Sequence, residues 1–287
     1  MAARVHILAL LALGGAAALP AAQHNPLLPS PPPPHIVAAA PGETAEATVV
    51  LQNNEYSLRK GIDKDLPGAV AFGSFANTLN TTGWGVLDIR TDSSGSDVEQ
   101  HHAAGYLEGA LTAEHIYYTY LNTMAFTFHG QPVPQSVKAF MTAQDEWARE
   151  QVTSKAGSDP FWAHVGALLA QFDGMIAGYA ATAAALSLPA LPTFAWQLLN
   201  GVGDLFQIIP AVEKKQRVDW PSLSREEARL ELRKAGHCSA LIKVVGDLSE
   251  LFMGHSSWFE YANTNRIFKN CPSALRLPAL RPLLIGF

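Results

Sequence analysis

The spacing of hydrophobic residues changes along this chain and separates a strand-like part from a helix-like part. Short apolar runs divided by Asn- and Gly-containing turns predict strands at residues 49–51, 68–75 and 83–89. From Asp97 onward, apolar residues recur every three or four positions, which is typical of helices. The pattern therefore predicts an α+β chain in which short strands precede several helices.

Helix start signals support this second part. Periodic apolar or charged stretches predict helices at residues 97–120, 136–152, 160–179 and 225–235. The third has Asp159 as a cap and Pro160 at its first position, and the fourth has Ser224 and Glu227 at capping-box spacing. Gly236 is expected to end that last helix, because glycine adopts the left-handed conformation at little cost.

A cysteine then stands at the start of a predicted hairpin. Cys238 opens an apolar, β-branched run that predicts a strand. Gly246 and Asp247 interrupt the run, and residues 248–254 can return as a second strand. A cysteine at this position, with His255 just past the return strand, is a credible site of thiol chemistry.

Structural roles are the alternative for the same residues. A lone cysteine in a strand is more often buried than reactive, so spacing alone favours a structural Cys238. Ser257 and Glu260 match a capping box, which predicts a helix that begins near Trp258 and continues through residue 268. By position alone, His255 is a strand-end histidine and Trp258 a core tryptophan.

Five sequence motifs are notable in this chain: TTGWGVLDI at 81–89, AAGYLEGALT at 103–112, LLNGVGDLFQIIP at 198–210, CSALIKV at 238–244 and HSSW at 255–258. Together they resemble the phospholipase B-like (lama) family of N-terminal-nucleophile (Ntn) hydrolases. The likeness covers roughly residues 72–269, in the family's order. It implies the α+β, αββα sandwich of Ntn hydrolases and an acyl hydrolase of lysosomes or the secretory route, without a cofactor.

The resemblance also implies the site. In the family the precursor is cut before the cysteine, which here is the bond between His237 and Cys238, and the new N-terminal cysteine becomes the nucleophile. Its α-amine serves as the base, and burial must lower the pKa of that amine for it to accept a proton in an acidic lumen. The site is therefore expected to be a partly closed pocket. His255 and Trp258 match positions that line the family's active site, where His255 would orient substrate or stabilise an oxyanion and Trp258 would wall the acyl pocket.

The sequence leaves open which substrate is hydrolysed and whether this chain is catalytically active. The family name implies phospholipid esters, whereas Ntn chemistry also suits an amide. Family members continue well beyond residue 287, and one hairpin does not complete a two-layer sheet. We therefore expect a truncated sandwich that neither cleaves itself nor hydrolyses substrate. A non-catalytic secreted fragment is the alternative function.

These assignments divide the chain into five parts. They are a signal peptide (1–22), a Pro/Ala-rich linker (23–46), an N-terminal portion (47–237), the start of the nucleophile chain (238–269) and an atypical tail (270–287). The signal peptide combines Arg4 with an apolar stretch and small residues before residue 22. Asn80 begins an Asn-Thr-Thr glycosylation sequon. A lysosomal or secreted glycoprotein without a transmembrane segment is expected.

Composition excludes several other classes. The chain has a net charge of −5, with 48% hydrophobic and 16% charged residues, so it is typical of a globular protein and has no basic character suited to nucleic acid. Its two cysteines, Cys238 and Cys271, are too few for a disulfide framework, and we expect them not to pair. The histidines lack the spacing of known metal motifs, so no metal is expected. Those considered were His101, His102, His115, His129 and His164.

Overall fold

The computed structural model describes residues 38–234, 238–257 and 259–271. The predicted signal peptide, most of the predicted linker, Gly236, His237, Trp258 and nearly all of the tail lie outside these ranges. The described part combines helices and strands, which confirms the α+β class.

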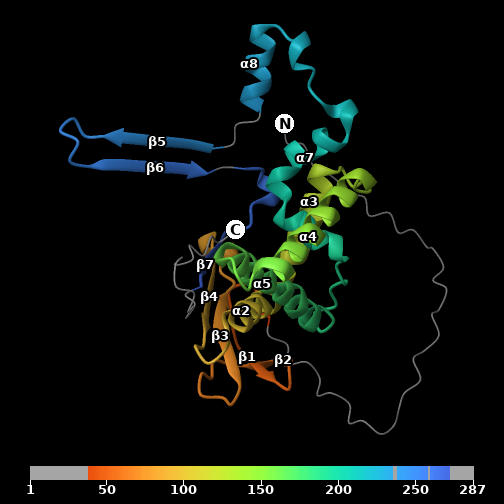
Figure 1. The fold of residues 1–287 in the computed structure, drawn as a ribbon. Coiled ribbons are helices and arrows are strands. Elements are labelled where there is room, and N and C mark those ends of the chain that lie inside the picture. Colours follow the sequence, from red (N-terminus) through yellow and green to blue (C-terminus); the bar gives the residue numbers. More distant parts are fainter. Residues whose placement is uncertain (1–37, 235–237, 258, 272–287) are drawn as a thin grey trace, which may run out of the picture. The chain divides into compact units, whose positions relative to one another are not determined.

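Five strands form one sheet in the order β2-β1-β3-β4-β7 (Figure 1). They are β1 (Thr44–Gln52), β2 (Glu55–Lys60), β3 (Ala69–Ala76), β4 (Gly85–Thr91) and β7 (Ile267–Asn270). The first four pair antiparallel, whereas β7 joins β4 in parallel, with Gly85 opposite Ile267. The predicted strands are confirmed, but β1 begins at Thr44, three residues inside the segment predicted as linker.

The predicted helices are present, and the predicted N-terminal caps of α5 and α8 form as expected. The bounds are α1 (Leu79–Thr82), α2 (Asp97–Leu111), α3 (Ala113–Thr127), α4 (Gln135–Lys155), α5 (Pro160–Ala183), α6 (Thr193–Asn200), α7 (Leu205–Val212) and α8 (Arg225–Lys234). The Asp159 carboxylate accepts a hydrogen bond from the Phe161 amide at 2.9 Å. Ser224 and Glu227 bond reciprocally, at 2.8 and 3.3 Å. The single helix predicted at 97–120 is instead two helices that meet at Thr112, whose hydroxyl donates to the Glu108 carbonyl at 2.7 Å.

Helix α2 packs across the sheet and lies along α5 (Figure 1). Its residues Ala103 and Leu107 join Val49, Phe75 and Leu87 of the sheet in one buried apolar cluster. Burial of apolar surface of this kind is the main favourable term in folding.

Glycines let α2 and α5 approach until their backbones touch. Gly105 and Gly109 of α2 face Gly174 and Gly178 of α5. A Cβ atom added at Gly105 would lie 1.9 Å from the Gln171 carbonyl oxygen, and one at Gly178 would lie 1.9 Å from the Tyr106 carbonyl oxygen. Only glycine is compatible with this contact.

The prediction of a helix after Ser257 is wrong. Residues Tyr261–Asn263 form a single 3-10 turn (η4), and β7 follows. The Glu260 carboxylate accepts a hydrogen bond from the Asn263 side-chain amide at 2.8 Å, and Ser257 ends a strand instead of capping a helix. Pairing of β7 with β4 thus prevails over a local capping pattern, as tertiary contacts commonly do.

Candidate active site

The predicted nucleophile hairpin is present. Strands β5 (Cys238–Val244) and β6 (Leu251–Ser257) pair antiparallel, with Cys238 opposite Ser257 and Ala240 opposite His255. The return strand begins three residues later than expected. Asp247 shapes the turn, because its carboxylate accepts hydrogen bonds from the Ser249 hydroxyl at 2.7 Å and the Ser249 amide at 3.2 Å.

The register places two of the predicted site residues on one face of the hairpin. Side chains along a strand alternate between faces, and directly paired residues share a face. Cys238 therefore points to the same side as Ala240 and its partner His255. Cys238 and His255 are diagonal neighbours, a relation that typically separates Cα atoms by roughly 7–8 Å. His237 and Trp258 lie outside the described residues, so the structure does not place them.

The described residues do not enclose Cys238. Every residue of β5 is exposed, Cys238 included. Apolar side chains on both faces are exposed as well: Leu241 is 67% exposed on one face and Met253 75% on the other. Strands with apolar residues on both faces are typical of sheets covered on both sides. The partly closed pocket expected from the sequence is therefore absent from the described part, and the hairpin has the surface of an interior strand pair.

The second cysteine occupies a different environment. No disulfide joins Cys271 to Cys238. Burial, and next the nearby Glu108 carboxylate, raise the pKa of the Cys271 thiol to about 11. A thiol with such a pKa stays protonated near neutral pH and is a poor nucleophile. Of the two cysteines, Cys238 is the exposed one and Cys271 is half-buried with a raised thiol pKa.

The segment after the hairpin is held by contacts to the N-terminal part of the chain. Strand β7 pairs with β4, and next to this pairing the Lys269 ammonium lies 2.6 Å from the largely buried Glu108 carboxylate. The Asn270 side-chain amide donates to the Asp88 carboxylate at 2.8 Å. Residues on both sides of the bond that precedes Cys238 are therefore joined by non-covalent contacts.

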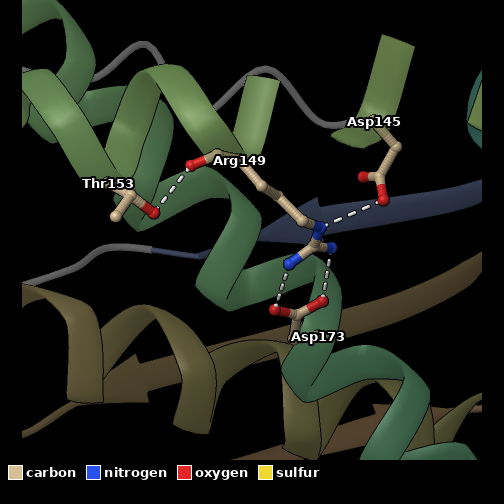
Figure 2. A network of polar contacts seen from close by, with 4 residues as sticks. All are labelled: Asp145, Arg149, Thr153 and Asp173. Atoms are coloured by element: carbon tan, nitrogen blue, oxygen red, sulfur yellow. Dashed lines mark hydrogen bonds and ion pairs between the residues drawn. The ribbon is translucent and has the colours of Figure 1, made fainter. Parts of the chain in front are cut away.

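A charged cluster between α4 and α5 has a structural role. The Arg149 guanidinium donates two hydrogen bonds to the Asp173 carboxylate, at 2.8 and 2.9 Å, and a third to Asp145 at 3.0 Å (Figure 2). These partners, with Asp173 the strongest, raise the pKa of Arg149. Since its charge is engaged by two carboxylates, we assign this cluster to helix packing and not to catalysis.

The histidines considered for a metal site lie in separate surroundings. The His101 ring lies 3.3 Å from the Gln171 side-chain oxygen, and the His102 ring stacks on Tyr56 with ring centres 4.1 Å apart. Burial lowers the pKa of His101, His102 and His115, which favours neutral rings. Across the three described ranges, no group of three or more His, Cys, Asp or Glu side chains is arranged to hold a metal ion.

The predicted glycosylation site is accessible. Asn80 is exposed within α1, and the hydroxyl of Thr82, the third sequon residue, donates to the Thr78 carbonyl at 3.0 Å. Within the described ranges, every helix is too short or too polar to span a bilayer.

We expect a glycan on Asn80 when the chain is made in a secretory cell, because an exposed sequon is open to the transferase. Glycosidase treatment should increase the gel mobility of the parent protein and leave Asn80→Gln unchanged. A parent protein with no mobility change would contradict the expectation. Asn200→Gln, which alters an asparagine outside any sequon, is the matched control and should behave like the parent.

Comparison with known proteins agrees with the motifs. The family model described as Phospholipase B matches residues 71–274. A "Phospholipase B" of Crotalus adamanteus is 36% identical over 219 residues, which covers 75% of this chain and 39% of the relative. "Phospholipase B-like 1" of Rattus norvegicus is 35% identical over 204 residues, covering 70% and 36%. "Phospholipase B-like protein B" of Dictyostelium discoideum is 34% identical over 203 residues, covering 70% and 35%. The chain thus spans less than two fifths of the length of these relatives.

Proposed function

The chain belongs to the phospholipase B family, and on that premise we propose that it is the nucleophile-bearing part of an acyl hydrolase that acts on phospholipid esters. One observation carries the proposal: within the matched region, an exposed cysteine begins a strand and shares a face with a histidine. An N-acyl amide is the alternative substrate class, since the same nucleophile can attack either carbonyl.

Cleavage of the chain is proposed as the first step. The Cys238 sulfur attacks the carbonyl carbon of His237, and the peptide C–N bond breaks as the amide nitrogen takes the thiol proton. Water then hydrolyses the resulting thioester to a carboxylate on His237 and a thiol on Cys238. The product is a new N-terminal cysteine with a free α-amine.

Hydrolysis then uses that amine as the base. The amine takes the Cys238 thiol proton, the sulfur attacks the acyl carbonyl, and the alcohol of the ester leaves with the proton. Water hydrolyses the thioester and releases the fatty acid. We propose that His255 donates a hydrogen bond to the oxyanion or orients the ester, and that Trp258 walls the acyl group. Oxyanion stabilisation of this kind is usually a large term in acyl transfer.

The active site is proposed to need further polypeptide over the hairpin. An N-terminal α-amine in water has a reference pKa of about 7.7–8.0, and only burial or nearby charge would lower that pKa. Because β5 is exposed along its length, the described residues do not supply that burial. Strands that pair with the hairpin edges, together with a second sheet and helices that cover its two apolar faces, would complete the αββα sandwich of an Ntn hydrolase, in the lysosomal lumen or after secretion.

Substrate assays test this function. We would extend this chain with the C-terminal part of a phospholipase B-like relative and follow fatty-acid release from a phospholipid and from an N-acyl amide. Release from the phospholipid is expected, together with a fragment whose first residue is Cys238. Turnover of the amide alone would favour the alternative substrate, and a folded protein that neither cleaves nor hydrolyses would favour a non-catalytic role.

A further inference from the structure

A small polar cavity lies between α3 and the segment that follows the nucleophile hairpin. Its volume is about 160 Å³, and it is lined by His115, Tyr118, Thr119 and Asn122 on one side and by residues 262–265 on the other. Hydrogen bonds join its two walls. The Thr123 hydroxyl donates to the Asn263 side-chain oxygen at 2.8 Å, and the Asn265 side-chain amide donates to the Thr119 hydroxyl at 3.4 Å.

The α3 wall presents three polar side chains that have no hydrogen-bond partner among the described residues, although the His115 ring packs edge-on against Phe75 and the Tyr118 ring lies beside Tyr117. His115, Tyr118 and Asn122 are three and four residues apart, so they share one face of the helix. In the ranges that the structure describes, none of the three side chains makes a hydrogen bond, and the His115 Nε2 atom is buried without a partner. Burial lowers the pKa of His115, so its neutral ring has one donor and one acceptor nitrogen.

The lining indicates the chemistry of a ligand. None of the lining side chains carries a formal charge when His115 is neutral, and an ion buried without a counter-charge is costly. Imidazole, amide and hydroxyl groups each offer donors and acceptors, as do the hydroxyl groups of a polyol. Tyr118, which is 53% exposed, adds an aromatic surface at the rim for the C–H face of such a molecule.

We propose that this cavity binds one uncharged polyol unit, either a free sugar or the inositol of a lipid head group. The volume corresponds to about five water molecules, which suits a ligand of that size. The two walls come from opposite sides of Cys238 in the sequence, so the ligand contacts both parts of the chain. The site uses neither Cys238 nor the hydrolase activity proposed above, and Cys238→Ala should bind the polyol as the parent does.

Ligand-observed saturation-transfer NMR on the 287-residue chain tests the proposal. The free probes are myo-inositol and methyl glucoside, and the lipid probes are short-chain phosphatidylinositol and short-chain phosphatidylcholine below their micelle concentrations. We expect saturable binding of at least one polyol probe. Asn122→Leu and Tyr118→Leu should each weaken the affinity for the polyol about tenfold. Each substitution removes a side chain that would hydrogen-bond to the bound polyol. Both positions are exposed, so circular dichroism should show an unchanged fold.

Tyr261→Leu is the matched control. Tyr261 is 98% exposed and directly precedes the 262–265 wall, but it does not line the cavity, so its loss should leave binding unchanged. Binding of the free probes identifies a saccharide-type site, and binding of phosphatidylinositol alone identifies a head-group site. The proposal is wrong if no polyol probe gives saturable transfer, if phosphatidylcholine binds equally well, or if the Asn122 and Tyr118 variants bind like the parent.

Discussion

Gly105→Ala should lower the free energy of unfolding by about 3 kcal/mol or more, enough to unfold a marginally stable chain. The added methyl group would lie 1.9 Å from the Gln171 carbonyl oxygen and 3.0 Å from the Met175 amide nitrogen. These are backbone atoms of α5, which do not rotate away as a side chain does. The two helices must separate, and the core beneath α2 would lose packing along their whole contact. Chemical denaturation followed by circular dichroism measures the change.

Gly166→Ala in α5 is the control for this substitution. Its methyl group would meet only the Val152 side chain, at 3.0 Å, and that side chain can shift. Alanine also favours a helix over glycine by about 1 kcal/mol, so we expect this variant to be near neutral. Equal unfolding midpoints for the Gly105 and Gly166 variants would contradict the backbone contact between α2 and α5.

Elements specified by nearby residues could be predicted from the sequence. The α5 start depends on Asp159 and Pro160, and the α8 start on Ser224 and Glu227, all within one helical turn of the boundary they set. The β5–β6 hairpin follows from two apolar runs on either side of Gly246 and Asp247. In each case the determining contacts are only a few residues apart, so a local pattern contains them.

Features that depend on distant partners could not be predicted. Residues 267–270 become a strand because β4, far earlier in the sequence, offers an edge to pair with, and a local capping pattern gave no sign of it. The four-residue spacing of Gly105 and Gly109 is visible in the sequence, as is that of Gly174 and Gly178. Only the structure shows that the two pairs face each other. The polar cavity was missed for the same reason, since it joins α3 to residues 262–265.

The candidate site divides in the same way. The placement of Cys238 at the start of a strand is local and agrees with the sequence interpretation, whereas His255, expected just past the return strand, lies within β6. The enclosure of the site is not local. Apolar residues on both faces of the hairpin, such as Leu241 and Met253, are typical of a strand pair covered on both sides, but they do not specify which residues would cover it.

In the extended protein described above, Cys238→Ala should leave the bond after His237 intact and lower hydrolysis by about 10⁴-fold or more. The substitution removes the only proposed nucleophile, so cleavage and turnover should fail together, and losses of nucleophiles elsewhere are of this size or larger. His255→Ala should fold, be cleaved and lose about 10²-fold in turnover, because an orienting or oxyanion-binding group assists the reaction without forming the covalent bond. Mass spectrometry of the fragments reports cleavage, and fatty-acid release reports turnover.

Cys271→Ala is the matched control for the nucleophile. Its thiol is half-buried with a raised pKa, so replacing it should change neither cleavage nor turnover. The cleaved protein should also stay in one piece under native conditions, because β7 pairs with β4 and Lys269 pairs with Glu108 across the cut. If the Cys238→Ala protein folds and still hydrolyses ester at the parent rate, the cysteine mechanism is wrong. If Cys271→Ala is the variant that loses activity, the nucleophile has been assigned to the wrong thiol.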